Sequence, residues 1–62
     1  MKIEFKTDSA AFKEPYTGND NEYAFWSEYT FVISRINDQV AAGMKSGTIL
    51  DSNGNKIGKW SL

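Results

Sequence analysis

The chain has 62 residues, seven basic and eight acidic side chains, and neither cysteine nor histidine. A chain of this length forms one small domain (residues 1–62) that buries about 60% of the surface its unfolded form exposes. The missing residue types exclude disulfides and thiolate ligands and make a conventional zinc site untenable, and the net charge of −1 argues against a dedicated nucleic-acid binder.

Hydropathy gives no sign of a membrane segment. No apolar run approaches the ~20 residues that span a bilayer, and residues 1–6 lack the apolar centre of a signal peptide. We therefore expect a cytoplasmic protein without membrane contact.

The first predicted element is a strand over residues 2–6. Polar and apolar side chains alternate there, which is typical of a half-buried strand, and Ile3 and Phe5 share the inward face. Residues 10–20 contain the single proline, Pro15, and are expected to form a loop. Residues 10–12 could form a short helical turn, and Phe12 and Tyr16 are expected to hold the loop against the domain.

A long amphipathic helix is predicted next. Asn19 as N-cap with Glu22 three residues later is a variant of the capping box, and Gly43 is a natural residue to end the helix. The predicted inward stripe consists of Trp26, Tyr29, Ile33, Ile36 and Val40, widened by Phe25 and Val32. The opposite, solvated face is expected to carry Ser27, Glu28, Ser34, Arg35, Asp38 and Gln39.

Residues 46–62 are predicted to form a β-hairpin around Asn53-Gly54, a dipeptide that favours a two-residue type I′ turn. This turn pairs Asp51 with Lys56, Leu50 with Ile57, Ile49 with Gly58, Thr48 with Lys59, and Gly47 with Trp60. The inward face then carries Ile49, Trp60 and Leu62, with Gly47 and Gly58 leaving room for the indole. Leu50 and Ile57 fall on the other face, unless a bulge at either glycine changes the assignment.

These elements predict an α+β fold of order β-α-β-β, in which one helix covers a three-stranded, mostly antiparallel sheet. We expect the C-terminal strand in the centre. In the alternative, residues 46–50 form the central strand and lie parallel to the first strand after a right-handed crossover.

Neither a metal site nor an enzyme is predicted. Residues 51–55 are rich in oxygen ligands, but an EF-hand needs its glycine at position six and a glutamate at position twelve. Without histidine or cysteine a catalytic base would be a carboxylate or lysine, and Glu14, Asp20 and Glu28 are spread over a loop and a helix. We expect no cofactor and no catalytic residue.

The excess of aromatic residues is more informative. Residues 23–31 contain five of them, which cannot all face one way on a helix. Phe31, together with Tyr23 or Tyr16, is therefore expected to be partly exposed. Exposed aromatic side chains are typical of protein interfaces, so we expect contact with another protein or a homodimer.

The two ends of the chain resemble a family of small uncharacterised proteins encoded by bacteriophages and prophages. The resemblance is carried by residues 2–12 (KIEFKTDSAAF) and by Gly43, Ser46-Gly47, Asp51, Asn53-Gly54-Asn55, Ile57-Gly58 and Trp60. It covers about two-thirds of the chain, and residues 13–31 depart from the family by being longer and more aromatic.

Some phage proteins of this size disable host proteins, including CRISPR and other immune systems. The resemblance therefore implies an anti-defence (anti-CRISPR-like) inhibitor in the cytoplasm of a bacterial host cell, which occludes a surface of a host protein. The candidate partner-binding residues are Glu14, Tyr16, Tyr23 and Phe31. One alternative is a nucleic-acid-binding or regulatory protein that uses Lys2, Lys6 and Lys59 on the open sheet face, beside Leu50 and Ile57; another is a structural homodimer.

Overall fold

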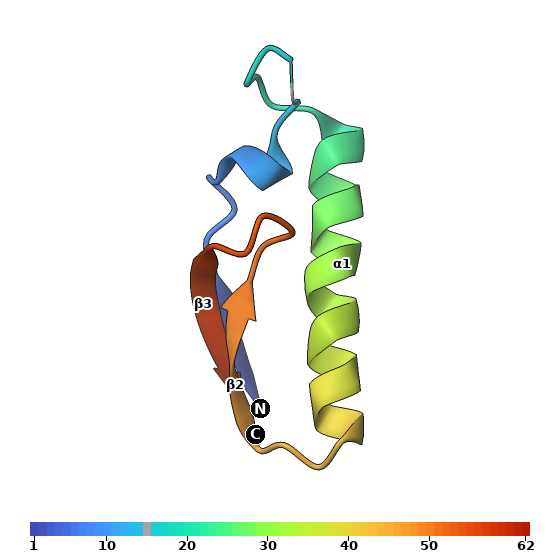
Figure 1. Cartoon of the computed structure of the whole chain (residues 1–62), viewed down its shortest axis with the longest axis vertical. Coiled ribbons are helices and arrows are strands. Elements are labelled where there is room, and N and C mark those ends of the chain that lie inside the picture. The colour runs from blue at the N-terminus through green and yellow to red at the C-terminus, as the bar shows by residue number, and fades with distance from the viewer. Residues whose placement is uncertain (15) are drawn as a thin grey trace.

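The computed structural model describes residues 1–14 and 16–62 and contains one helix layer beside one sheet layer (Figure 1). Strand β1 (Lys2–Phe5) is followed by a single 3-10 turn, η1 (Ala10–Phe12), and by helix α1 (Glu22–Ala41). Strands β2 (Ser46–Leu50) and β3 (Lys56–Ser61) form the hairpin that closes the chain. The molecule is elongated, 39 × 18 × 15 Å, and its two termini lie close together at one end of the sheet.

The strand order is β1-β3-β2, and β3 pairs with both neighbours in antiparallel fashion. The predicted α+β fold with a central C-terminal strand is therefore confirmed, and the parallel alternative is wrong. Helix α1 packs against β2 and η1, so it lies over one side of the sheet and leaves β1 incompletely covered.

Helix α1 begins two residues later than the capping box predicted. The N-cap is Asn21, whose side-chain oxygen accepts the Ala24 N–H at 3.1 Å, and not Asn19. The end of the helix is confirmed: Gly43 has a φ of +91°. The Gly43 N–H donates to the Val40 carbonyl oxygen, and the Met44 N–H donates to the Gln39 carbonyl oxygen. These are the paired hydrogen bonds of a Schellman motif.

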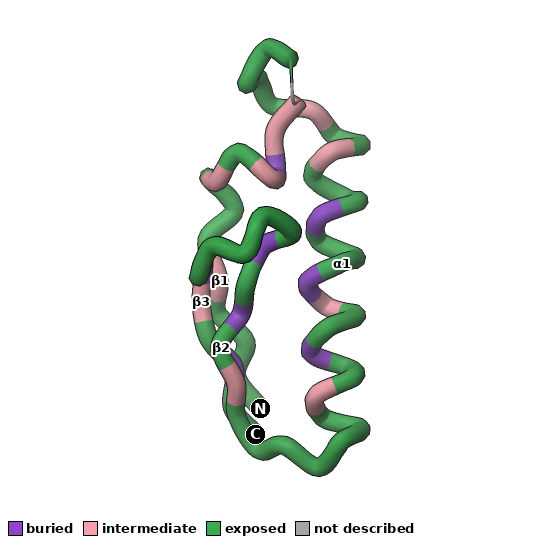
Figure 2. Tube along the Cα trace, viewed as in Figure 1, coloured by how far each residue is buried: buried purple, intermediate pink, exposed green. Residues whose placement is uncertain are grey.

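The inward stripe of α1 is rotated from the predicted one. Glu28, Val32 and Ile36 are its buried residues, whereas Trp26 and Tyr29 are largely exposed. Figure 2 shows the buried positions along the side of α1 that faces the hairpin. The apolar side chains of α1 form two overlapping stripes, both with helical spacing. The stripe that is buried is the one that brings polar side chains of α1 within hydrogen-bond distance of the hairpin.

The hairpin differs from the predicted turn in its loop length. The Asp51 N–H donates to Asn55 O and the Gly54 N–H to Asp51 O, so the loop has three residues, with Gly54 at φ +85°. Pairing from Ile49–Gly58 to Gly47–Trp60 agrees with the prediction.

Between the loop and the pairs that agree with the prediction, the register of the hairpin shifts, because Leu50 pairs with Lys56 and not with Ile57. Ile57 occupies a bulge and is buried, whereas Leu50 is exposed. The predicted pairs Leu50–Ile57 and Asp51–Lys56, and the predicted outward position of Ile57, are therefore wrong.

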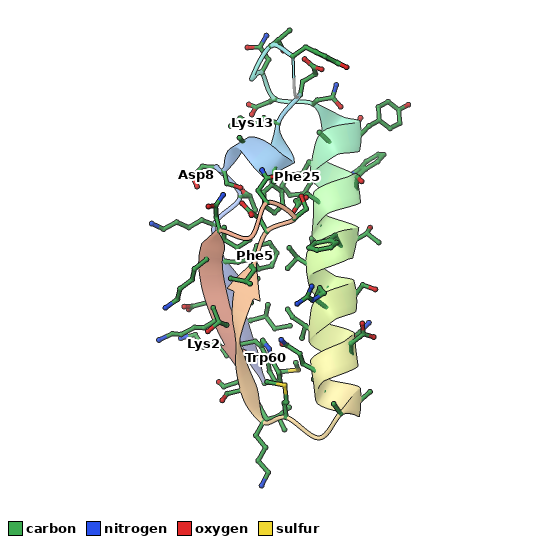
Figure 3. The ribbon with its side chains drawn as sticks, viewed as in Figure 1. Lys2, Phe5, Asp8, Lys13, Phe25 and Trp60 are labelled. Carbon is green, nitrogen blue, oxygen red and sulfur yellow. The ribbon has the colours of Figure 1, made fainter. Side chains whose placement is uncertain are left out.

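The core lies between the hairpin and α1. It consists of Phe12, Val32, Ile36, Ile49, Ile57 and Trp60, with Phe5 and Ile33 packed at its margin. Trp60 lies between the layers (Figure 3), and its Nε1–H donates to Gln39 Oε1 at 2.6 Å.

The glycines and the chain ends refine this arrangement. Gly47 leaves space for the indole as predicted, whereas Gly58 instead permits the close approach of β1. The predicted core positions of Ile3 and Leu62 are wrong, since both side chains are exposed.

Candidate partner-binding surface

Two aromatic side chains lie together on the solvent-facing side of α1, near its N-terminus. Tyr23 is 79% exposed and Trp26 is 54% exposed, and their rings meet edge to face with centroids 6.1 Å apart. A tryptophan with half its surface in water is unusual in a chain whose core has only six buried apolar residues among the described positions. This pair forms the centre of the candidate surface.

The loop before α1 carries a further exposed aromatic residue, Tyr16, which is 94% exposed. The expectation that Tyr16 holds the loop against the domain is therefore wrong, whereas Phe12 does so and is buried. The loop is organised by Glu14, whose Oε2 accepts the N–H groups of Tyr16 at 3.1 Å and Thr17 at 2.7 Å. Hydrogen bonds from Thr17 and from the Tyr16 amide hold the pKa of Glu14 below its ordinary value. Glu14 thus positions Tyr16 and is engaged within the loop.

An acidic groove of about 480 Å³ lies between η1 and the start of α1. Its lining residues are Thr7, Asp8, Phe12, Lys13, Asp20, Asn21, Glu22 and Phe25. Figure 3 shows Asp8, Lys13 and Phe25 around this region. Lys13 Nζ lies 2.7 Å from Asp20 Oδ1, and its hydrogen bond and positive charge lower the pKa of Asp20. With Lys13 paired, the groove offers the carboxylates of Asp8 and Glu22 to an incoming cation.

Phe31 is 37% exposed, as expected, but it lies apart from this surface. Phe31 lies five positions after Trp26, which corresponds to a rotation of about 140° around a helix with 3.6 residues per turn. The Arg35 guanidinium lies 5.9 Å from the centroid of the Phe31 ring. The structure therefore brings Tyr23 and Trp26 together and leaves Phe31 on a different side of α1.

The buried carboxylates have structural partners. Glu28, predicted to be solvated, accepts hydrogen bonds from Ser52 N at 2.7 Å and Ser52 Oγ at 2.6 Å. Asp51 Oδ1 accepts the N–H groups of Asn53 at 3.0 Å and Asn55 at 2.9 Å.

The pKa of Asp51 reflects opposing effects. Burial raises it, but the hydrogen bonds from Asn55, with smaller contributions from Ser9 and Asn53, outweigh burial and lower it. The Ser9 hydroxyl is buried and has no partner at hydrogen-bond geometry, so the Asn55 hydrogen bonds are the main cause of the lowered pKa. A lowered pKa suits a permanently ionised carboxylate and not a general acid.

The sheet carries the opposite charge. The three strands hold Lys2, Lys56 and Lys59 and a single carboxylate, Glu4. A groove of about 460 Å³ along β1 and β3 is lined by Lys6, Lys56 and Lys59 together with Glu4, Phe5, Ile57 and Gly58.

Sequence reasoning missed Trp26, because it assigned this residue to the core. The signal that could have identified it is the second helical stripe through Glu28, Val32 and Ile36, which leaves Trp26 outside. Among residues 1–14 and 16–62, no cluster of three or more acidic side chains could hold a metal ion. No helix within the same residues is long and apolar enough to cross a membrane.

No protein-family model matches the chain, and neither a curated protein nor a solved structure matches it.

Proposed function

We propose that this protein acts without catalysis, by binding a larger protein through the surface formed by Tyr16, Tyr23 and Trp26. The observation that carries the proposal is the paired exposure of Tyr23 and Trp26. Tyrosine and tryptophan provide much of the binding energy at interfaces, because they bury large areas with few rotatable bonds. Glu14 supports this role by fixing the backbone on either side of Tyr16.

The acidic groove beside this surface defines the chemistry of the partner. Asp8 and Glu22 line it together with the apolar floor of Phe12 and Phe25. Arginine suits such a site, since its guanidinium pairs with carboxylates and stacks on aromatic rings. The partner would present one or more arginine or lysine side chains next to an apolar patch.

The resemblance to phage-encoded proteins makes a bacterial host protein, and in particular a defence protein, the proposed partner. The mechanism would be steric: a rigid wedge 39 Å long covers a functional surface of the host protein. Phe31, on another side of α1, would provide a second contact. The expected homodimer remains part of this proposal and would use a surface that leaves these side chains free.

The proposal is tested by affinity capture from a nuclease-treated bacterial lysate, followed by mass spectrometry. The decisive comparison is between the native chain, Trp26→Ala and Met44→Ala, since Met44 is an exposed apolar residue near the other end of α1. Loss of a central aromatic anchor typically weakens binding by about 2 kcal/mol or more, roughly 30-fold. We expect Trp26→Ala to lose a host protein that the native chain and Met44→Ala both retain.

The steric mechanism has its own readout. Once a captured partner is purified, its activity should fall in proportion to the fraction bound, and Trp26→Ala should restore it. For a CRISPR effector, the measurement is cleavage of target DNA with increasing inhibitor. Binding without loss of activity would reject inhibition while leaving the interaction intact.

The lysine-lined groove favours a second candidate, a nucleic-acid-binding protein. Lys6, Lys56 and Lys59 surround it, but Ile57, expected on this face, is buried, and no aromatic side chain is exposed there for bases to stack on. Binding of single-stranded DNA that weakens steeply with salt, and that is lost in Lys59→Glu, would favour this candidate.

A further inference from the structure

Strand β1 is a free sheet edge beside an uncovered apolar side chain. It lies outermost in the order β1-β3-β2. Ile3 stands directly opposite Trp60 in β3, so both side chains point to the helix side of the sheet. Trp60 is buried there, but Ile3 is 39% exposed. Helix α1 packs mainly over β2 and reaches β1 at Phe5, whose ring centroid lies 6.5 Å from that of Tyr29.

The backbone of β1 can accept a further strand. The Lys6 N–H donates to Ile57 O, and the Glu4 carbonyl oxygen faces Gly58, so the polar groups of these even-numbered residues face β3. Antiparallel pairing alternates along a strand. The N–H and C=O groups of Ile3 and Phe5 therefore point toward the free edge.

The other edge, β2, would gain less from pairing. Its inward apolar residue, Ile49, is already buried against α1. Leu50, the other apolar residue of β2, is as exposed as Ile3 but lies on the outer face of the sheet. A strand added at β2 would therefore form hydrogen bonds without covering an exposed apolar side chain on the helix side. At β1, pairing would also shield Ile3 and the neighbouring exposed Met1.

We propose that two copies of this chain pair through β1, antiparallel, with the two-fold axis at Ile3. In this register Ile3 contacts Ile3 of the second copy, and Lys2 of each copy stands opposite Glu4 of the other. The two cross-strand ion pairs form on the outer face, whereas Ile3 lies on the helix side. The result is a continuous six-stranded sheet in which neither β1 edge is exposed.

Charge selects this register over its neighbours. Centring the axis on Glu4 would set Glu4 opposite Glu4 and Lys2 opposite Lys6, which places like charges together. Centring it on Phe5 would pair Glu4 with Lys6, but Lys6 lies beyond the end of β1. Phe5 is also half-buried against Phe12 and Tyr29, with ring centroids 6.2 and 6.5 Å apart, so it has less surface to offer.

The surface of the single chain fits this proposal. Its accessible area is 4475 Å², whereas a compact monomer of 7.0 kDa exposes about 4,000 Å². Its radius of gyration is 12.1 Å, compared with about 10.6 Å for a compact domain of this length. Both differences reflect the elongated shape of the chain, which leaves more surface open than a compact domain of this size does.

The test is sedimentation equilibrium of the isolated protein, which reports whether the species has the 7.0 kDa mass of one chain or twice that mass. We expect Lys2→Glu to weaken the dimer by about tenfold or more, because both symmetric ion pairs become repulsive. Lys2→Glu/Glu4→Lys should restore it, since the swap recreates both pairs. The swap also preserves the ion pair between positions 2 and 4 of the same chain, which in the native protein joins Lys2 and Glu4 at 3.0 Å.

Lys6→Glu is the matched control, the same charge reversal just beyond the paired segment, and should leave the dimer unchanged. Thr48→Glu should also leave it unchanged, since it adds a carboxylate to the β2 edge. A native chain that remains monomeric at millimolar concentration would overturn the proposal, as would dissociation by Lys6→Glu or Thr48→Glu but not by Lys2→Glu. Trp26→Ala should stay dimeric. The test of the dimer is therefore independent of the proposed partner-binding surface.

Discussion

Gly47 is the position where one added methyl group most directly tests the packing of Trp60. A Cβ atom at Gly47 would lie 2.5 Å from Trp60 Nε1 and 2.8 Å from Gln39 Oε1. These two atoms form the 2.6 Å hydrogen bond that joins β3 to α1. Gly47→Ala therefore forces the Trp60 indole away from the Gln39 amide oxygen that accepts its hydrogen bond.

The expected loss follows from two opposing effects. Overpacking a well-filled core costs about 1–3 kcal/mol, whereas replacing glycine in a strand recovers up to about 1 kcal/mol of chain entropy. The net destabilisation is then about 1–2 kcal/mol, or roughly 5–15 °C in Tm for a domain of this size. That is a large fraction of the roughly 3–9 kcal/mol expected for 62 residues.

The assay is urea unfolding monitored by far-ultraviolet circular dichroism, in the native and the Trp60→Phe backgrounds. Phenylalanine lacks the Nε1 atom that the new methyl group would meet. Gly47→Ala should therefore cost less in the Trp60→Phe background. Equal cost in both backgrounds, or a Gly47→Ala variant as stable as the native chain, would refute this account of the packing.

The remaining predictions concern the core, the hairpin turn and α1. Trp60→Ala should lower the free energy of unfolding by about 3–5 kcal/mol in urea titrations. Glu28→Ala should cost about 2–4 kcal/mol and Ser52→Ala about 1 kcal/mol, since the latter keeps the backbone hydrogen bond; equal losses would contradict this. The folded-state pKa of Asp51 is below its ordinary value of 3.8, so its contribution is present above that pH and disappears as the pH falls through the folded pKa. The urea midpoint should accordingly depend less on acid pH in Asp51→Asn. Phe31→Ala should weaken partner binding measured by calorimetry while leaving Tm nearly unchanged, and a large fall in Tm would show that Phe31 belongs to the core.

The existence and order of the elements could be predicted, because each has a strong local signal. Alternation in residues 2–6, helical spacing after residue 22 and Asn53-Gly54 each specify one type of structure. The rotation of α1 could not be predicted in the same way. Trp26 and Val32 belong to two stripes of similar apolar character, and the choice depends on tertiary contacts made by Glu28 and Gln39.

The turn shows why the position of a hairpin is easier to predict than its register. Asp51 accepts two loop amides, which favours a three-residue loop and shifts the pairing by one residue. The bulge at Ile57 reverses that shift, so the pairs from Ile49–Gly58 onward agree with the simple hairpin. The three-residue loop and the bulge both depend on burying Ile57 and Asp51 together. Local sequence propensity gives no information about this tertiary requirement.

The candidate surface was predicted in part, for a related reason. Too many aromatic residues in one segment forces some of them outward, and Tyr16, Tyr23 and Phe31 are indeed exposed. Their count does not say which of them lie together. The pairing of Tyr23 with Trp26 and the use of Glu14 inside its own loop follow from the rotation of α1 and from loop hydrogen bonds.

The same turn also connects stability with the proposed binding. The N–H groups of residues 52–55 all have acceptors: Glu28 for Ser52, the Asp51 side chain for residues 53 and 55, and the Asp51 carbonyl for Gly54. The carboxylate and carbonyl oxygens of Asp51, in this oxygen-rich segment, therefore already accept hydrogen bonds from the backbone of the segment itself. In a chain without disulfides, the contact between Glu28 and Ser52 ties α1 to a turn 24 residues away. Because Glu28 lies two residues after Trp26, this tie would hold the proposed aromatic surface in place before binding and would reduce the ordering that binding requires.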